Sequence, residues 1–123
     1  MNQAPLEAIL DELMGRYPGV RGCALVEAAS GLVWTRRPEV DSHGIWEAAV
    51  EHWRLQQRLA QHFGALGASH AIVIYHGDAK FALLPCLRDP DVLLVCLAEH
   101  GNVDWHAWQR DARQLGSRIH AAL

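Results

Sequence analysis

The sequence has few of the features that mark a membrane, secreted or nucleotide-binding protein. No apolar run approaches the roughly 20 residues that a membrane-spanning helix needs. The N-terminal stretch opens into an amphipathic segment with acidic residues rather than a signal peptide, and neither common glycine-rich phosphate loop occurs. Cys23, Cys86 and Cys96 form no Cys-x-x-Cys pair and sit in apolar runs, as buried thiols of a reducing compartment do. We therefore expect a soluble cytoplasmic protein.

The composition is that of one folded domain. Of the 123 residues, 50% are hydrophobic and 20% are charged, so the chain can bury a core. The net charge is −3 and the basic residues are scattered, which argues against a nucleic-acid partner. There is no repeat, linker or low-complexity tract, and we expect a single domain over residues 1–123.

Turn residues divide the chain into helices and strands. Pro18 and Gly19 end a first helix, and Gly77-Asp78 is typical of a tight hairpin turn. The predicted helices cover about residues 6–16, 44–63 and 102 or 104 to 121, and the predicted strands cover 22–26, 32–34, 71–75, 80–84 and 92–97. The order α-β-β-α-β-β-β-α predicts a mixed α/β (α+β) fold with one central five-stranded antiparallel sheet packed by helices.

The connections carry the expected capping residues. Residues 36–40 form an exposed connection that contains Arg36-Arg37, and Asp41 or Ser42 is expected to cap the second helix. Asn102 or Asp104 is expected to cap the last helix. Trp105 and Trp108 follow three residues apart, where they can pin that helix to the sheet or form a partner-binding patch; we expect at least one of them in the core.

The second helix is apolar over more of its circumference than one sheet can cover. At 100° per residue the apolar arc spans about 220°, whereas a helix on a single sheet needs little more than ~100°. Trp46 and Trp53 lie two turns apart on nearly the same side. Since a buried Trp removes roughly 150–250 Å² from water, the pair can supply much of an interface, and a two-fold self-contact covers such a stripe without a second gene product. The alternative is that both plug the edge of a monomer core.

No arrangement of residues predicts catalysis or a cofactor. Cys96, His100 and His106 match no standard zinc spacing, and Asp89 and Asp91 around Pro90 are ordinary turn chemistry. No serine sits in a Gly-x-Ser-x-Gly setting. We therefore expect no catalytic residues, no metal and no cofactor, and hence a protein that is not an enzyme.

The order of these elements resembles the Roadblock family of dynein-light-chain-like proteins. The resemblance rests on the Pro-Gly-Val-x-Gly stop at residues 18–22, the Ser30-Gly31 turn and the Gly77-Asp78 hairpin. It also rests on Leu-Pro-Cys-Leu-Arg-Asp at 84–89 and on the strand that ends at Leu97. It covers nearly the whole chain, and its specificity lies in order and spacing. Departures are the Ala-Ala-Ser-Gly first turn and the Trp105/Trp108 pair.

The resemblance implies a homodimeric, non-catalytic regulatory or scaffold subunit that binds and modulates a small Ras-like GTPase or a larger assembly. Carried over by position, it implies a dimer interface made by the second helix and the third strand: Trp46, Val50, Trp53, Gln57, Ile72 and Ile74. A different class stays open, a profilin-like module that senses a small ligand in a pocket between sheet and helix.

Overall fold

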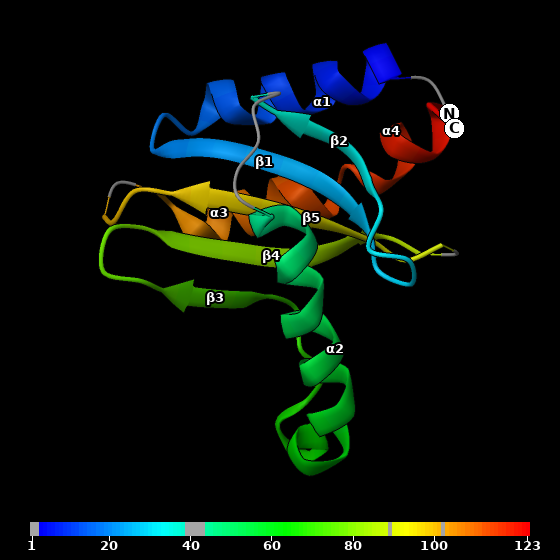
Figure 1. Cartoon of the computed structure of the whole chain (residues 1–123), viewed down its shortest axis with the longest axis vertical. Helices are drawn as coiled ribbons and strands as arrows, with labels where there is room; N and C mark the ends of the chain where they lie inside the picture. The colour runs from blue at the N-terminus through cyan, green and yellow to red at the C-terminus, as the bar shows by residue number, and fades with distance from the viewer. Residues whose placement is uncertain (1–2, 39–43, 89, 102) are drawn as a thin grey trace.

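The computed structural model describes residues 3–38, 44–88, 90–101 and 103–123. The elements follow in the order α1 (Gln3–Arg16), β1 (Val20–Glu27), β2 (Val33–Arg37), α2 (Ile45–Phe63), the 3-10 helix η1 (Gly64–Leu66), β3 (Ile72–Tyr75), β4 (Lys80–Leu87), β5 (Val92–Ala98), α3 (Trp105–Arg113) and α4 (Gly116–Ala121). The five strands form one antiparallel sheet in the order β2-β1-β5-β4-β3 (Figure 1). The predicted fold class is confirmed.

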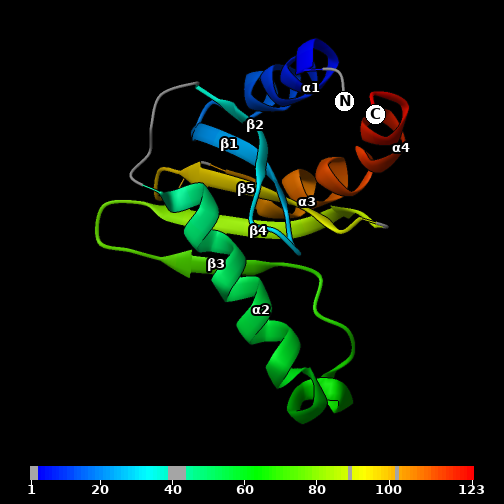
Figure 2. The same ribbon diagram turned by 45° about the vertical axis from the view of Figure 1, so that its right-hand side comes forward.

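Helices cover both faces of the sheet unequally. α1, α3 and α4 pack on one face, and α2 crosses the other (Figures 1 and 2). Side chains of β4 alternate between the two cores, with Leu84 toward α3 and α4 and Leu83 toward α2. Because both faces of the central strands are buried, their sequences are continuous apolar runs rather than alternating ones.

The predicted connection at residues 36–40 is wrong for its first two residues. Arg36 and Arg37 belong to β2, where they pair with Ala24 and Cys23 of β1. The guanidinium of Arg37 donates from Nε to a carboxylate oxygen of Asp11 at 2.9 Å and so ties β2 to α1. The expected caps Asp41 and Ser42 lie outside the described residues.

The last helix is two helices, not one. Asp104 caps α3 by accepting a hydrogen bond from the Ala107 backbone N–H at 3.1 Å, as expected for one of the two candidates, and Asn102 lies outside the described residues. The chain then turns so that the backbone of Gly116 reaches β4, where a Cβ on Gly116 would lie 2.7 Å from the Cys86 carbonyl oxygen. Trp108 is fully buried, which confirms the expected core position.

The C-terminal edge of β4 is irregular. Pro85 lies inside the strand, and the register with β5 shifts between Pro85 and Leu87. A proline is tolerated in a sheet at such a bulge because its missing N–H is not needed in the ladder. Among the described residues, no helix is both long and apolar enough to cross a bilayer.

Candidate interaction surface

The buried residues found in the described part of the second helix all lie near its start. Trp46, Ala49 and Val50 are the buried residues of α2, and residues 57–70 are all exposed. Beyond its first turns the helix leaves the sheet and extends past the edge strand β3 (Figures 1 and 2). Among the residues that the structure describes, no layer covers the C-terminal half of α2.

The projecting half of α2 exposes large apolar side chains. Leu55, Leu59 and Phe63 recur every four residues on one side of the helix and are 44%, 37% and 47% exposed, and Leu66 of η1 is 83% exposed. We call these four residues the distal stripe. A contiguous apolar stripe of this kind on a soluble protein marks a contact surface.

Five of the six residues assigned to the interface by position share one hydrophobic cluster: Trp46 and Val50 belong to it, and Trp53, Ile72 and Ile74 pack against it. Trp46 and Val50 are 2% and 1% exposed, and the Trp46 ring packs over Gly22 of β1, where an added Cβ would lie 3.4 Å from it. Both side chains are thus covered by their own sheet. Trp53 is half-buried and Gln57 is exposed on the next turns of the helix. Ile72 and Ile74 are half-buried on the α2 face of β3.

The outer edge of β3 has no neighbouring strand in the described part of the chain. β3 pairs with β4 alone, and the His76 N–H bonds the Ala79 carbonyl at 2.8 Å in the connecting turn. Because hydrogen-bonded pairs alternate along an antiparallel ladder, Ile74 and Ile72 bond toward β4. The N–H and C=O groups of Val73 and Tyr75 consequently point to the free edge, where another strand can add.

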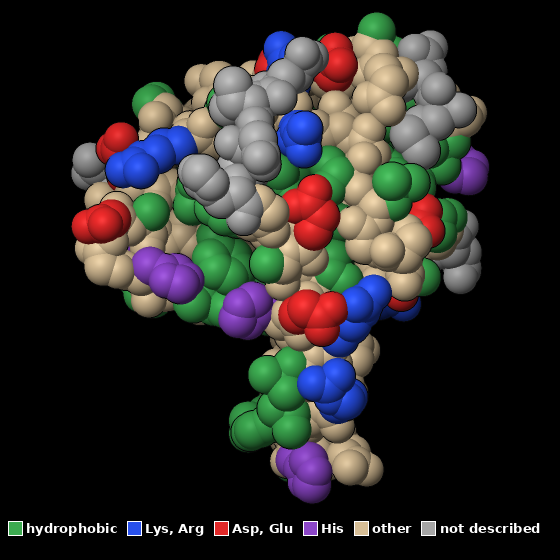
Figure 3. All heavy atoms as spheres, in the orientation of Figure 1, with side chains coloured by type: hydrophobic (Ala, Val, Ile, Leu, Met, Phe, Trp, Pro, Cys, Tyr) green, Lys and Arg blue, Asp and Glu red, His purple; other side chains and the backbone are tan. Residues whose placement is uncertain are grey.

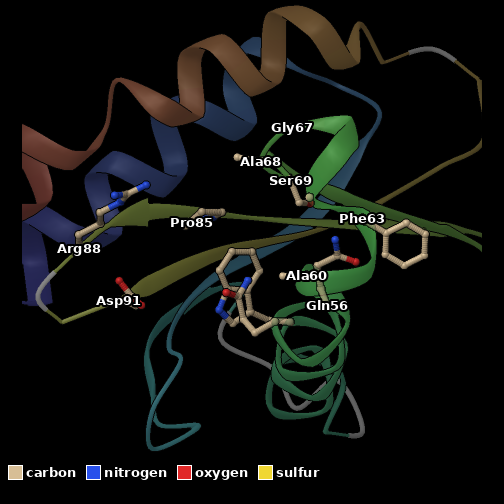
Figure 4. A pocket seen from close by; sticks show the side chains of 12 residues that line it. Gln56, Ala60, Phe63, Gly67, Ala68, Ser69, Pro85, Arg88 and Asp91 are labelled. Atoms are coloured by element: carbon tan, nitrogen blue, oxygen red, sulfur yellow. The ribbon is translucent and has the colours of Figure 1, made fainter.

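Two hollows flank α2. One of about 550 Å³ lies under the distal half of the helix and is lined by Trp53, Gln57 and Phe63 from α2 and by Ser69, Arg88 and Asp91 from the chain around it. Figure 4 shows Phe63 at one end of this cavity and Arg88 and Asp91 at the other. We call it the α2 cavity.

The second hollow, of about 610 Å³, lies between the start of α2 and the β3–β4 turn, and we call it the hairpin cavity. Ile45, Ala48 and His52 of α2 line one side, and His76, Phe81 and Leu97 line the other. The His52 and His76 rings lie 5.3 and 5.6 Å from the Phe81 ring. Hydrophobic and histidine side chains gather side by side on this face of the molecule (Figure 3).

In the described part of the chain, the histidines and cysteines form no metal-binding group, and the three thiols are buried. Among the described residues, no three His, Cys, Asp or Glu side chains are placed to hold a metal ion, so Cys96, His100 and His106 do not converge. Burial raises the pKa of the Cys23 and Cys86 thiols to about 12 and that of Cys96 well above its usual value. A thiol nucleophile needs a lowered pKa, so these cysteines are inert core residues.

No family model and no curated protein matches the sequence, whereas solved structures match its fold. A Roadblock/LC7 domain from Streptomyces avermitilis superimposes with a TM-score of 0.76 at 16% identity, covering 93% of each chain. A structure described as MglB with tetrameric arrangement gives a TM-score of 0.75 at 20% identity, over 100% of this chain and 96% of the other. MglB of Myxococcus xanthus gives 0.74 at 11% identity, over 98% and 91%. The chain has the Roadblock fold, as its sequence predicted.

Proposed function

We propose that this chain is a non-catalytic regulatory or scaffold subunit that works as a homodimer, joined through α2 and the edge of β3. The observation that carries the proposal is the projecting half of α2, whose distal stripe is exposed beside an open strand edge. The fold shared with Roadblock proteins supports it.

A two-fold axis perpendicular to the sheet at the β3 edge would cover both the free edge of β3 and the distal stripe of α2. It pairs the outward groups of Val73 and Tyr75 with those of a second copy and places both α2 helices on the same side of a ten-stranded sheet. Because α2 extends past its own β3 (Figure 2), its distal half then lies over the sheet of the partner copy. The hairpin cavity of the second copy is open on that face.

The fit is apolar on both sides. Leu59 and Phe63 would enter a hollow whose walls include Ile45, Phe81 and Leu97. Full burial of one such side chain stabilises by about 1.5–3 kcal/mol relative to leaving it in water. The proposed interface comprises Trp53, Gln57, Ile72 and Ile74 together with the distal stripe. Trp46 and Val50 support the interface indirectly, because they are buried against the sheet and fix the start of α2.

The partner implied by the family resemblance is a small Ras-like GTPase or a larger assembly. A scaffold of this kind acts by positioning loops of its partner, so it needs no acid, base or nucleophile of its own. The proposal therefore accommodates the inert cysteines and the scattered histidines. The paired α2 helices would form a continuous, raised surface on one side of the dimer for such a contact.

The partner assay uses small GTPases encoded near the gene for this chain. Single-turnover GTP hydrolysis and release of a labelled nucleotide are measured with wild type, Phe63→Glu and Gln61→Glu at equal concentrations. A change in either rate with wild type and Gln61→Glu, and none with Phe63→Glu, supports a dimer-dependent regulator. Unchanged rates together with no co-purification would remove the GTPase from the proposal.

The hairpin cavity also supports a second candidate, the ligand-sensing module. Its three rings and apolar walls suit a small planar ligand, and mouse profilin IIa matches the chain with a TM-score of 0.54 at 15% identity, over 94% and 95%. A thermal-shift screen separates the two, because a bound ligand raises the melting temperature with its saturation. A stabilising small molecule that also leaves the chain monomeric would favour the sensor.

A further inference from the structure

A third hollow lies at the end of β4 and shares Ser69, Pro85 and Arg88 with the α2 cavity. It measures about 390 Å³ and opens between the loop that precedes β3, the end of β4 and the junction of α3 with α4. Its polar side chains are Ser69, His70, Arg88 and Arg113. We call it the basic cavity and define it by these four residues.

The basic cavity is positively charged, whereas the chain as a whole is negatively charged. The protein carries a net charge of −3, yet no carboxylate is found among the described residues that line the cavity. Asp91 lines the adjoining α2 cavity together with Ser69 and Arg88, and it does not line this one. The cavity therefore concentrates positive charge on an acidic protein.

Both arginines of the cavity keep their guanidinium groups available. Five arginines of the described residues pair with carboxylates: Arg16, Arg21, Arg37, Arg54 and Arg118. Arg113 instead donates to the amide oxygen of Gln109 at 3.3 Å, and within the described ranges no ion pair is found for Arg88. A guanidinium is a planar fork of donors that matches the geometry of an oxyanion.

The walls of the cavity are fixed and neutral. Gly116 packs against the Cys86 carbonyl so tightly that no side chain fits between α4 and β4. The Cys86 thiol turns inward, toward the Val92 carbonyl at 3.4 Å, and Pro85 and Leu87 complete the apolar wall. Low-dielectric walls around charges of one sign strengthen the field that an anion meets.

From this arrangement we propose that the basic cavity binds a phosphate or diphosphate group carried by a small molecule. Arg88 and Arg113 would supply guanidinium groups, and the Ser69 hydroxyl and His70 imidazole would add hydrogen bonds. The volume suits one such group with a small substituent and is too small to enclose a peptide segment. None of its four defining residues belongs to the distal stripe, although Ser69 and Arg88 also line the α2 cavity beside Phe63.

The test is isothermal titration calorimetry of the full chain with inorganic pyrophosphate. Arg88→Gln and Arg113→Gln are compared with Arg110→Gln, which removes the same charge from α3 outside the cavity. We expect saturable one-site binding that each cavity substitution weakens about tenfold or more, and that Arg110→Gln changes less than twofold. Binding should also weaken as chloride is raised.

Two results would overturn the site. One is the absence of saturable binding at millimolar pyrophosphate, and the other is an equal loss of binding in Arg110→Gln, which would reduce the effect to net charge.

Co-sedimentation with phosphatidylcholine vesicles, with and without phosphatidylinositol phosphate, distinguishes a lipid headgroup from a soluble ligand as the source of the phosphate. Retention by the phosphorylated lipid that the two cavity variants lose supports a headgroup, and binding of pyrophosphate alone supports a soluble ligand. Leu59→Glu, a change at a residue of the distal stripe that lines neither the α2 cavity nor the basic cavity, should bind pyrophosphate as wild type does, which separates this site from the dimer proposal.

Discussion

The Nζ of Lys80 lies 4.8 Å from the centroid of the Trp105 ring, and the ring of Tyr75 lies 5.4 Å from the same atom. Lys80 is the single lysine of the chain and is 4% exposed. It stands on β4 opposite Tyr75 of the edge strand, and Trp105 is the first residue of α3. One cation thus joins the edge of the sheet to the helix that covers it.

The contact between Lys80 and Trp105 should be measurable as a coupling energy. A cation over an aromatic face is worth about 0.5–2 kcal/mol. In a double-mutant cycle of Lys80→Met and Trp105→Leu, followed by urea unfolding, we expect a coupling of that size. Lys80→Met keeps most of the apolar stem, so the loss reports the charge. Strictly additive effects would mean that the ammonium contributes nothing through this ring.

Gly116 should tolerate no side chain, because a Cβ there would lie 2.7 Å from the backbone carbonyl of Cys86. Backbone cannot move aside as a flexible side chain does, so we expect Gly116→Ala to lower the free energy of unfolding by about 1–3 kcal/mol. Gly15 provides the matched control, since its Cβ would meet nothing within 4 Å and it lies inside α1. Gly15→Ala should stabilise by up to ~1 kcal/mol through helix propensity. Equal effects of the two substitutions in thermal unfolding would contradict the close packing of α4 on β4.

Tyr17 should make stability fall at high pH. Burial, and then its hydrogen bond to the Asp111 carboxylate, raise the pKa of Tyr17 from its usual 10.0 to about 12. Between these values the folded chain keeps a proton that the unfolded chain has released. The contribution is therefore full below pH 10.0 and is lost as the pH rises through about 12.

Cys23 and Cys86 should also make the protein less stable as the pH rises, since burial raises the pKa of both thiols from 9.0 to about 12. Replacing Tyr17 separates its contribution to the pH dependence of stability from that of the cysteines. Urea midpoints measured across this range should decline less steeply for Tyr17→Phe than for wild type. Parallel declines would show that the tyrosine is not the group that titrates.

The two tryptophans of α2 should respond differently to removal. Trp46 is almost fully buried, so Trp46→Ala should cost about 3–5 kcal/mol of stability. Trp53 is half-buried beside the α2 cavity, so Trp53→Ala should cost less in the isolated chain and weaken self-association. Chemical unfolding at high dilution measures the first quantity, and sedimentation measures the second. If Trp53→Ala lowered the free energy of unfolding more than Trp46→Ala does, the assignment of Trp46 to the core and Trp53 to the interface would be wrong.

The order of elements could be predicted from turn residues and apolar runs, but the path of α2 could not. Trp46 and Trp53 are equivalent by helical position, and only the point where α2 leaves the sheet distinguishes them. That point depends on how far the sheet extends beneath the helix, which is a tertiary property. The wide apolar arc correctly indicated that α2 lacks a full cover within its own chain.

The break between α3 and α4 also could not be predicted from the sequence. Gly116 was the only visible interruption of the last predicted helix, and a lone glycine there is compatible with a continuous helix at modest cost. The break becomes necessary only because the chain must approach Cys86 of β4. The basic cavity was also hidden, since Ser69, Arg88 and Arg113 are far apart in sequence and meet only in the folded chain.

Sedimentation equilibrium measures whether the projecting half of α2 holds two chains together in a two-fold dimer. Wild type, Phe63→Glu and Gln61→Glu are compared at micromolar concentration; the last two introduce the same charge on opposite sides of the distal helix. We expect twice the chain mass of 13.7 kDa for wild type and Gln61→Glu, and the mass of one folded chain for Phe63→Glu. A monomeric wild type, or a Phe63→Glu variant that remains dimeric, would contradict it.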